Sequence, residues 1–177
     1  IQQQMVEVQR SDEAYRSLAE HSLQALVIIQ DMRFVFVNSV FERISGYGAS
    51  ELLAMPASRV RELIHPDDRD IILERAARRL SGKAAPAQYE FRMMCSDGSV
   101  KWLEAFTVLT EFEGKPAIQQ TGIDVTERKR AEEALRDSEQ KYRTMAENIA
   151  DIVWTIDMTN CFTFVSPSIE HILGYGA

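Results

Sequence analysis

The chain has 177 residues, of which 45% are hydrophobic and 27% charged, a composition that suits one globular domain with additional segments and excludes an intrinsically disordered protein. Its formal net charge of −7 argues against a nucleic-acid partner, because affinity for phosphates comes from Lys and Arg, and no apolar run approaches the ~18 residues that span a bilayer. Cys95 and Cys161 follow no metal-binding or redox spacing, so we expect a reduced, cytoplasmic chain without a metal site.

The first 21 residues predict a helix that enters the domain. Its less polar positions are spaced alternately by three and four residues, as in a heptad seam, at Val8, Ser11, Tyr15 and Leu18. We therefore expect residues 1–21 to form a helix that flanks the domain.

A hairpin and two short helices are predicted next. Ala25–Gln30 and Phe34–Asn38 are rich in β-branched and aromatic residues around a short turn, which indicates two antiparallel strands. Val40–Ile44 predicts a short helix that ends before Gly46. Ser50 is placed to cap the short helix that follows.

A longer helix is predicted from Pro66 onward. Proline fits the first helical turn, and Asp67 and Asp68 favour the positive end of the helix dipole. Ser81-Gly82 ends this helix. Apolar residues recur at every fourth position along it, with arginines on the other faces, at Ile72, Ala76 and Leu80.

After this helix the pattern changes to a period of two, which predicts strands. Hairpin turns are indicated at Asp97-Gly98 and Glu113-Gly114, and a last strand covers Ala117–Asp124. Two strands, a helical middle and three strands predict an α+β domain over residues 22–126, with a five-stranded antiparallel sheet and helices on one face. The alternating large residues are Tyr89, Phe91, Met93, Val100, Trp102 and Phe106.

Residues 127–149 predict a linker helix without Gly or Pro. Two interpretations stay open: the helix pairs with its counterpart in a parallel homodimer, or it folds back on its own domain. A polar Ser138 and a small Ala131 would make a coiled coil marginally stable, which suits a part that changes state. The seam, spaced alternately by four and three residues, consists of Ala131, Leu135, Ser138, Tyr142, Met145 and Ile149.

Residues 150–177 repeat the start of the domain. Tyr15-Arg16, before the domain, recurs as Tyr142-Arg143 at an offset of 127 residues, and Gly46–Ala49 recurs as Gly174–Ala177 at an offset of 128. An offset of this size is the length of a whole domain and far exceeds a solenoid repeat. We therefore expect residues 150–177 to be the truncated start of a second domain of the same kind, in a fragment of a longer protein.

Four stretches resemble a PAS domain of the S-box type with its C-terminal PAC segment. In chain order they are "LVIIQ…FVFVNSVFERISGYGASEL", "IHPDDR", "YEFRMMCSDGSVKWLE" and "GIDVTERKRAEEAL". The resemblance implies the PAS fold with strand order 2-1-5-4-3, in a bacterial sensor protein with tandem PAS domains and signalling helices. It also implies a downstream effector domain in the same protein, a histidine kinase of a two-component phosphorelay or, as the alternative, a diguanylate cyclase.

The same resemblance bears on cofactors. Blue-light relatives carry a reactive Cys in the region that corresponds to Ala54–Arg61, and haem-binding relatives carry a His on the long helix, here residues 67–81; this chain has neither. We therefore expect no haem and no cysteinyl-flavin, which leaves room for a small non-covalent ligand. PAS pockets lie between the sheet and the helices, and the candidate lining residues, which plain core packing would also explain, are Val27, Ile29, Phe36, Phe41, Ile72, Phe91, Trp102 and Phe106.

Asp124 and Thr126 form a D-x-T motif at the end of the domain. Either side chain can cap the helix that begins near Glu127, and the motif is interpreted either as a structural cap alone or as a cap that also relays a signal. No phosphoacceptor His setting, P-loop or G-x-S-x-G sequence is present, so we expect no enzyme activity in this segment. The sequence thus favours a sensory and signal-relay module, with a passive dimerisation spacer that binds no ligand as the alternative.

Overall fold

The structure is a computed structural model that describes residues 22–148, 154–165 and 169. It contains two compact units, of which the first ends at Glu127 and the second begins at Arg128. The helix predicted for residues 1–21 lies outside the described residues, as does Ile149 of the seam. Among the described residues, no helix is both long enough and apolar enough to cross a bilayer.

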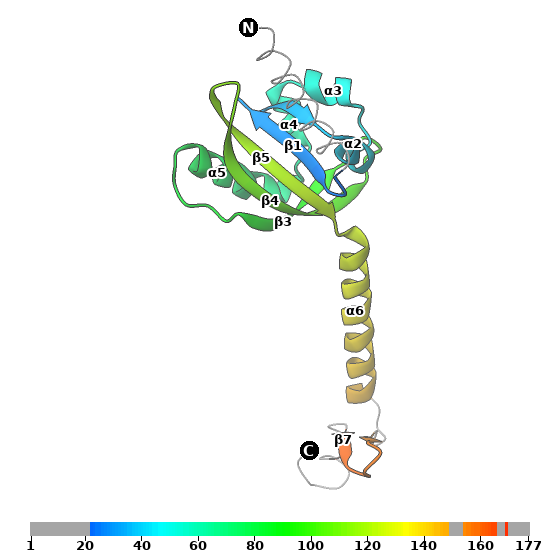
Figure 1. Ribbon diagram of the computed structural model, residues 1–177. Coiled ribbons are helices and arrows are strands. Elements are labelled where there is room, and N and C mark those ends of the chain that lie inside the picture. Colours follow the sequence, from blue (N-terminus) through cyan, green and yellow to red (C-terminus); the bar gives the residue numbers. More distant parts are fainter. Residues whose placement is uncertain (1–21, 149–153, 166–168, 170–177) are drawn as a thin grey trace. The chain divides into compact units, whose positions relative to one another are not determined.

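The first unit is built on a five-stranded antiparallel sheet (Figure 1). Its strands are β1 (Ala25–Gln30), β2 (Arg33–Val37), β3 (Gln88–Met94), β4 (Val100–Phe112) and β5 (Lys115–Asp124). Their order across the sheet is β2-β1-β5-β4-β3, which confirms the predicted order and the α+β class. The N-terminal hairpin therefore joins the C-terminal strands through the β1–β5 pair, in which Val27 lies opposite Gln120.

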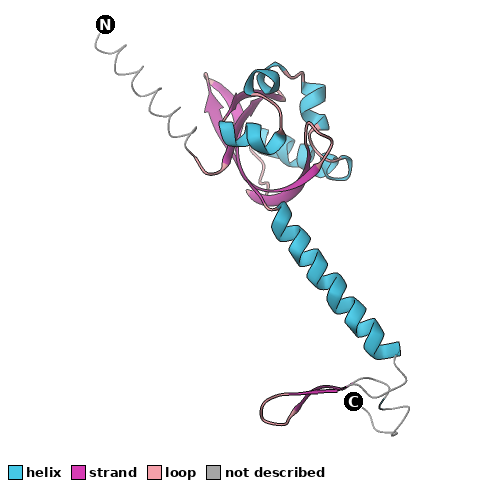
Figure 2. Cartoon of the chain, turned by 90° about the vertical axis from the view of Figure 1, so that its right-hand side faces the viewer, coloured by secondary structure: helices cyan, strands magenta, loops and turns pink. Residues whose placement is uncertain are grey.

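Four helices connect β2 to β3 and cover one face of the sheet, as Figure 2 shows. They are α2 (Ser39–Ser45), α3 (Ala49–Ala54), α4 (Ala57–Glu62) and α5 (Pro66–Leu80). The sequence pattern did not predict α4. The core lies between these helices and the sheet, and its buried residues include Val27 of β1, Leu52 of α3, Val60 of α4 and Phe91 of β3.

The caps of the short helices differ in part from the prediction. Gly46 ends α2 with a left-handed backbone (φ 77°), and a Cβ atom at this position would lie 2.4 Å from the Ser96 hydroxyl oxygen, so only glycine fits. The prediction that Ser50 caps the next helix is wrong, because α3 begins at Ala49 with Gly48 as its N-cap. The Ala49 amide donates instead to the carboxylate of Glu42, at 2.8 Å.

The buried face of α5 differs at its C-terminal end from the predicted row of apolar residues, Ile72, Ala76 and Leu80. Leu80 is 46% exposed, whereas Arg79 is only 8% exposed. The inward residues follow the spacing Ile72, Ala76 and Arg79, which also places residues on one face of a helix. Arg79 tolerates this position because its apolar stem covers core surface while its guanidinium donates to the carbonyl of Pro86.

The second unit contains most of α6 (Thr126–Asn148), together with β6 (Trp154–Ile156) and β7 (Phe162–Val165), which pair antiparallel. The helix covers almost the whole predicted linker. Two of its seam residues are exposed, Leu135 at 62% and Tyr142 at 71%. The surface of α6 therefore carries large apolar side chains in contact with solvent.

Candidate functional site

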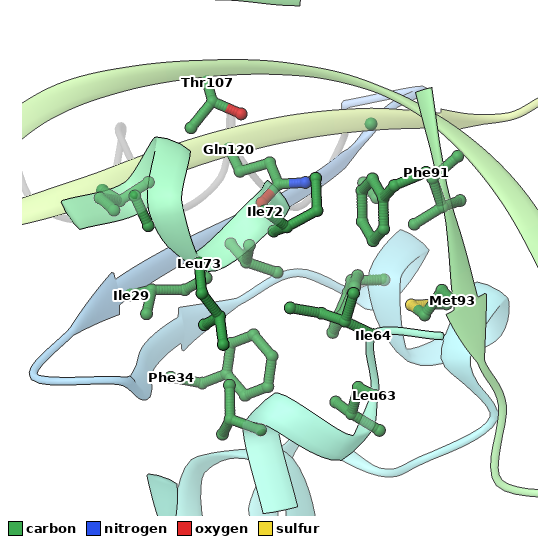
Figure 3. Close-up of a pocket in the computed structure, with 18 of the residues that line it drawn as sticks. Ile29, Phe34, Leu63, Ile64, Ile72, Leu73, Phe91, Met93, Thr107 and Gln120 are labelled. Carbon is green, nitrogen blue, oxygen red and sulfur yellow. The ribbon is translucent and has the colours of Figure 1, made fainter. Parts of the chain in front are cut away.

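A cavity of about 90 Å³ lies between the sheet and the helices α4 and α5. Figure 3 shows Ile72 and Leu73 of α5 on one side and Ile29 and Phe34 of the β1–β2 hairpin on another. The lining is mostly apolar. Of the residues predicted to line a pocket, five do so: Val27, Ile29, Phe41, Ile72 and Phe91.

Phe36 is not among the residues that line the cavity, and a β-bulge explains the error. The register of β1 and β2 places Ile29 opposite Phe34 and Ile28 opposite Phe36, so that Val35 is an extra residue. Phe34 consequently shares the inner face with Ile29 and is buried at 6% exposure. The inward aromatic residue of this strand is Phe34, and the prediction for Phe36 is corrected.

Trp102 and Phe106 do not line the cavity either. They alternate along β4 with Leu103 and Thr107, which do line it, so they lie on the opposite face of the sheet. Phe106 is 52% exposed. The ring of Trp102 instead contacts Arg92, whose guanidinium carbon lies 5.5 Å from the ring centroid.

Part of the inner face of β4 and β5 leaves space because two facing residues there are small. Ala105 and Gly122 lie opposite each other on the two strands and are buried. A Cβ atom built on Gly122 would meet only the carbonyl oxygen of Glu104, at 3.8 Å. Large side chains at these positions would fill the region that Thr107 and Gln120 line in Figure 3.

Four polar residues line the otherwise apolar cavity: Arg79, Tyr89, Thr107 and Gln120. The Thr107 hydroxyl donates to the Tyr89 hydroxyl at 3.0 Å. Arg79 and Thr107 are held at neighbouring points of one loop, because a guanidinium N–H of Arg79 donates to the Pro86 carbonyl and the Thr107 amide donates to the Ala87 carbonyl. The sequence pattern did not indicate these four residues as site residues.

The junction at the end of β5 is the second candidate site. One carboxylate oxygen of Asp124 accepts hydrogen bonds from the Thr126 amide at 3.0 Å and from the Thr126 hydroxyl at 2.6 Å. The Thr126 oxygen in turn accepts from the Trp102 amide at 2.9 Å, and the Val125 amide donates to the Trp102 carbonyl at 2.9 Å. The D-x-T motif thus joins β4, the end of β5 and the start of α6.

The charge of Asp124 is stabilised at this junction. Partial burial raises its pKa, but the hydrogen bonds from Thr126 and the nearby Lys101 together outweigh that effect and hold the pKa below its ordinary value. The Lys101 ammonium, 3.6 Å from the other carboxylate oxygen, acts in the same direction. Asp124 is therefore an anion at neutral pH and can act as an acceptor for the first turn of α6.

The described residues hold no group of three or more His, Cys, Asp or Glu side chains that could bind a metal ion. His65 caps α5, since its ring nitrogen accepts from the Asp67 amide at 3.3 Å. The arrangement is that of a small binding cavity beside a hydrogen-bonded strand–helix junction.

Two family models match the chain. One, described as PAS fold, matches residues 34–121, and the other, described as PAS domain, matches residues 140–177. Together they cover more than half of the 177 residues. Both the domain and the repeat at its C-terminal side therefore match models of the same fold.

Two similar curated proteins are kinases. Sensor histidine kinase TmoS of Ectopseudomonas mendocina is 27% identical over 80% of this chain and 14% of its own length. Sporulation kinase A of Bacillus subtilis is 26% identical over 75% of this chain and 22% of its own length. The chain thus spans less than a quarter of either relative.

Solved structures of the same fold include a sensory box histidine kinase/response regulator from Burkholderia thailandensis, with a TM-score of 0.55 and 26% identity. The match covers 75% of this chain and 97% of that chain. The PAS domain of an HTR-like protein from Haloarcula marismortui has a TM-score of 0.54 at 19% identity over 70% of this chain and 99% of that chain, a likeness of fold alone.

Proposed function

The chain belongs to the PAS domain family, and on this basis we propose that residues 22–126 are a cytoplasmic sensory module that passes a signal to an output domain of the same protein. The proposed output domain is a histidine kinase, since both curated relatives described above are kinases. Residues 1–21 and 127–149 are the signalling helices, and residues 150–177 begin a second PAS domain.

One observation supports the relay proposal: two adjacent residues of β4 contact the two sites, one lining the cavity and the other bonding to the junction. Leu103 lines the cavity. Its neighbour Trp102 bonds through its backbone to both Thr126 and Val125. A ligand that moves Leu103 changes the position of the Trp102 backbone, and with it the hydrogen bonds that hold the first turn of α6. The bound state then differs in how the helix leaves the sheet.

Replacing Asp124 with Ala tests the relay. The substitution removes both bonds from Thr126 and is expected to lower the free energy of unfolding by about 1 kcal/mol, as for the loss of a helix cap. In the full-length parent kinase it is expected to change autophosphorylation about fivefold at unchanged protein level, because about 1 kcal/mol shifts a two-state equilibrium by that factor. Autophosphorylation with labelled ATP and an immunoblot measure the two quantities.

Asp97→Ala is the matched control for this experiment. Asp97 also accepts a bond from a backbone amide two residues later, that of Ser99 at 2.9 Å, but it lies in the β3–β4 turn. We expect its loss to leave autophosphorylation unchanged. Equal effects of Asp97→Ala and Asp124→Ala on output, or no effect of either, would refute the relay and favour a passive spacer.

We further propose that α6 pairs with its counterpart in a homodimer, which the exposure of Leu135 and Tyr142 supports. Leu135→Lys is expected to weaken dimerisation about 100-fold, because two buried leucines are lost per dimer. Sedimentation equilibrium of the 177-residue chain measures this. Gln140→Lys, on the opposite face of the helix, is the control and is expected to leave the dimer intact. A monomeric parent chain at micromolar concentration would instead favour a helix that folds back on its own domain.

A further inference from the structure

Arg79 is a buried cation without a counter-ion in the part of the chain that the structure describes. Its side chain lines the cavity and is 8% exposed. One terminal nitrogen donates to the Pro86 carbonyl, while the other, Nη1, is buried and has no hydrogen-bond partner among the described residues. An arginine cannot lose its charge by deprotonation, so this site favours an anion that completes the pair.

Two acidic residues of α5 are close to arginines other than Arg79. Asp68 pairs with Arg92 at 2.6 Å, and Glu74 lies 3.9 Å from Arg78. A second cation, Arg75, lies near Tyr89 of the cavity wall: its guanidinium carbon is 4.7 Å from the centroid of the Tyr89 ring. Among the described residues, no carboxylate forms an ion pair with Arg79, so an incoming anion does not have to displace one.

Neutral donors accompany Arg79 along the cavity wall. The Thr107 hydroxyl donates its proton to the Tyr89 oxygen, which leaves the Tyr89 O–H free to donate in turn. Gln120 adds a carboxamide, which Figure 3 shows extending from β5 toward Ile72. A guanidinium, a phenol and an amide are all donors that a carboxylate, with about four acceptor sites, can use.

The size of the cavity limits the rest of the ligand. Its volume of about 90 Å³ is below the ~150 Å³ of a cavity that holds benzene, and far below the ~300 Å³ at which pockets for drug-sized ligands begin. Flavin and haem exceed this space several times over. The remaining lining is apolar, with Ile29, Phe34 and Leu73 among its members. The space suits a chain of roughly three to five carbons.

We infer that the cavity binds a short-chain aliphatic monocarboxylate, whose carboxylate pairs with Arg79 and whose hydrocarbon part lies among the apolar residues. This inference rests on the proposed sensory function and names the chemical class of its signal. In the competing explanation Arg79 has a structural role alone: its hydrogen bond to the Pro86 carbonyl connects the last turn of α5 to the loop.

Butyrate and its uncharged isostere butanamide distinguish the two explanations on the unaltered 177-residue chain. Calorimetric titration at constant ionic strength is expected to show butyrate binding at least tenfold tighter than butanamide, with n-butylamine not binding. Acetate and octanoate extend the series and are expected to bind more weakly than butyrate, the first for lack of apolar contact and the second for lack of space. Equal binding of butyrate and butanamide, or no binding across the series, would overturn the inference.

Arg79→Gln is the matching variant, and Arg78→Gln is its control. Arg78 is the adjacent residue, its side chain is 49% exposed, and it also donates to a loop carbonyl, that of Ala84. We expect Arg79→Gln to weaken butyrate binding at least tenfold while Arg78→Gln leaves it unchanged. If Arg79→Gln does not fold, the butyrate–butanamide comparison still decides the matter. An altered output of Asp124→Ala in the parent kinase, together with no carboxylate binding, would reject this ligand class and leave the proposed relay standing.

Discussion

Asn38→Ala is expected to lower the free energy of unfolding by about 3 kcal/mol. The Asn38 side chain is fully buried, at 0% exposure, and bonds to three backbone groups. Its oxygen accepts from the Leu26 amide at 2.9 Å and from the Phe41 amide at 3.1 Å, and its nitrogen donates to the Gln24 carbonyl at 3.0 Å. Each lost bond costs about 1 kcal/mol. The cost is not recovered, because the buried backbone groups that lose their partner cannot bond to water instead.

The effect is large because one side chain serves two elements. Asn38 is the N-cap of α2 and at the same time holds the start of β1, so its loss loosens the helix and the N-terminal hairpin together. Equilibrium unfolding in urea, followed by far-ultraviolet circular dichroism, measures the change. Asn38→Asp keeps the two accepting bonds and loses the donor to Gln24, so we expect an intermediate loss.

Ser50→Ala is the control for this prediction. The sequence pattern makes Ser50 a helix cap, but the structure gives α3 no side-chain cap and leaves Ser50 exposed. Its replacement is therefore expected to change the free energy of unfolding by less than about 0.5 kcal/mol. A loss at Ser50 equal to that at Asn38, or a loss below 1 kcal/mol at Asn38, would contradict the assignment of the caps.

The strands and the helical middle were predictable from the residue pattern because local signals agree with the tertiary fold, whereas the order of the strands in the sheet came only from the resemblance to PAS domains. The β1–β2 turn shows why this works even without a glycine: Asp31 and Met32 both adopt positive φ, at 50° and 59°, in the two-residue turn that matches strand twist. The Glu113-Gly114 turn does the same at 49° and 75°. Alternation and turn residues are local properties, and a single sequence carries them.

The face of each strand was harder to predict than the strand itself. In β2 the extra residue at Val35 reverses the alternation, and nothing in "RFVFV" distinguishes that bulge from a regular strand. In β4 the larger aromatic residues suggested the inner face, yet the cavity requires small residues there, such as Ala105. The size of a side chain therefore does not show which face of a strand lines the cavity: Phe106 is large and yet 52% exposed.

Arg79 shows how far the candidate site could be predicted from the sequence. In "ERAARRL" three arginines follow one another closely, and the pattern gives no reason to bury one of them. Burial depends on the Pro86 carbonyl, which a separate loop brings to the end of α5. A contact between a helix and a distant loop is a tertiary property, so the charged member of the cavity became visible only in the structure.

Asp68→Asn is expected to lower the free energy of unfolding by about 2 kcal/mol at pH 7. One carboxylate oxygen of Asp68 accepts from the Arg92 amide at 2.8 Å and from its Nε at 3.0 Å, and the other accepts from Nη2 at 2.6 Å. These charge-assisted bonds tie the first turn of α5 to the edge strand β3. An asparagine keeps one accepting oxygen but turns an N–H₂ group toward the guanidinium.

The stability that Asp68 contributes is expected to depend on pH, and its pKa fixes the direction. The hydrogen bonds from the Arg92 side chain hold the pKa of Asp68 below the ordinary 3.8. Since the folded-state pKa is lowered, the stabilisation is fully present above the unfolded value and is lost as the pH falls from 3.8 through the lowered value. The stability difference between the unaltered chain and Asp68→Asn is therefore expected to stay constant from about pH 7 to pH 5 and to shrink below the ordinary carboxyl range.

Asp70→Asn is the control that distinguishes the Asp68–Arg92 ion pair from a general effect of negative charge near the start of α5. Asp70 lies in the same helix, is exposed, and has no ion pair among the described residues. Urea midpoints of the three proteins between pH 7 and pH 3 are expected to coincide for Asp70→Asn and the unaltered chain. A stability difference for Asp68→Asn that stays unchanged down to pH 3 would show that the carboxylate form of Asp68 does not supply the stabilisation, and that the shape of the residue at this position does.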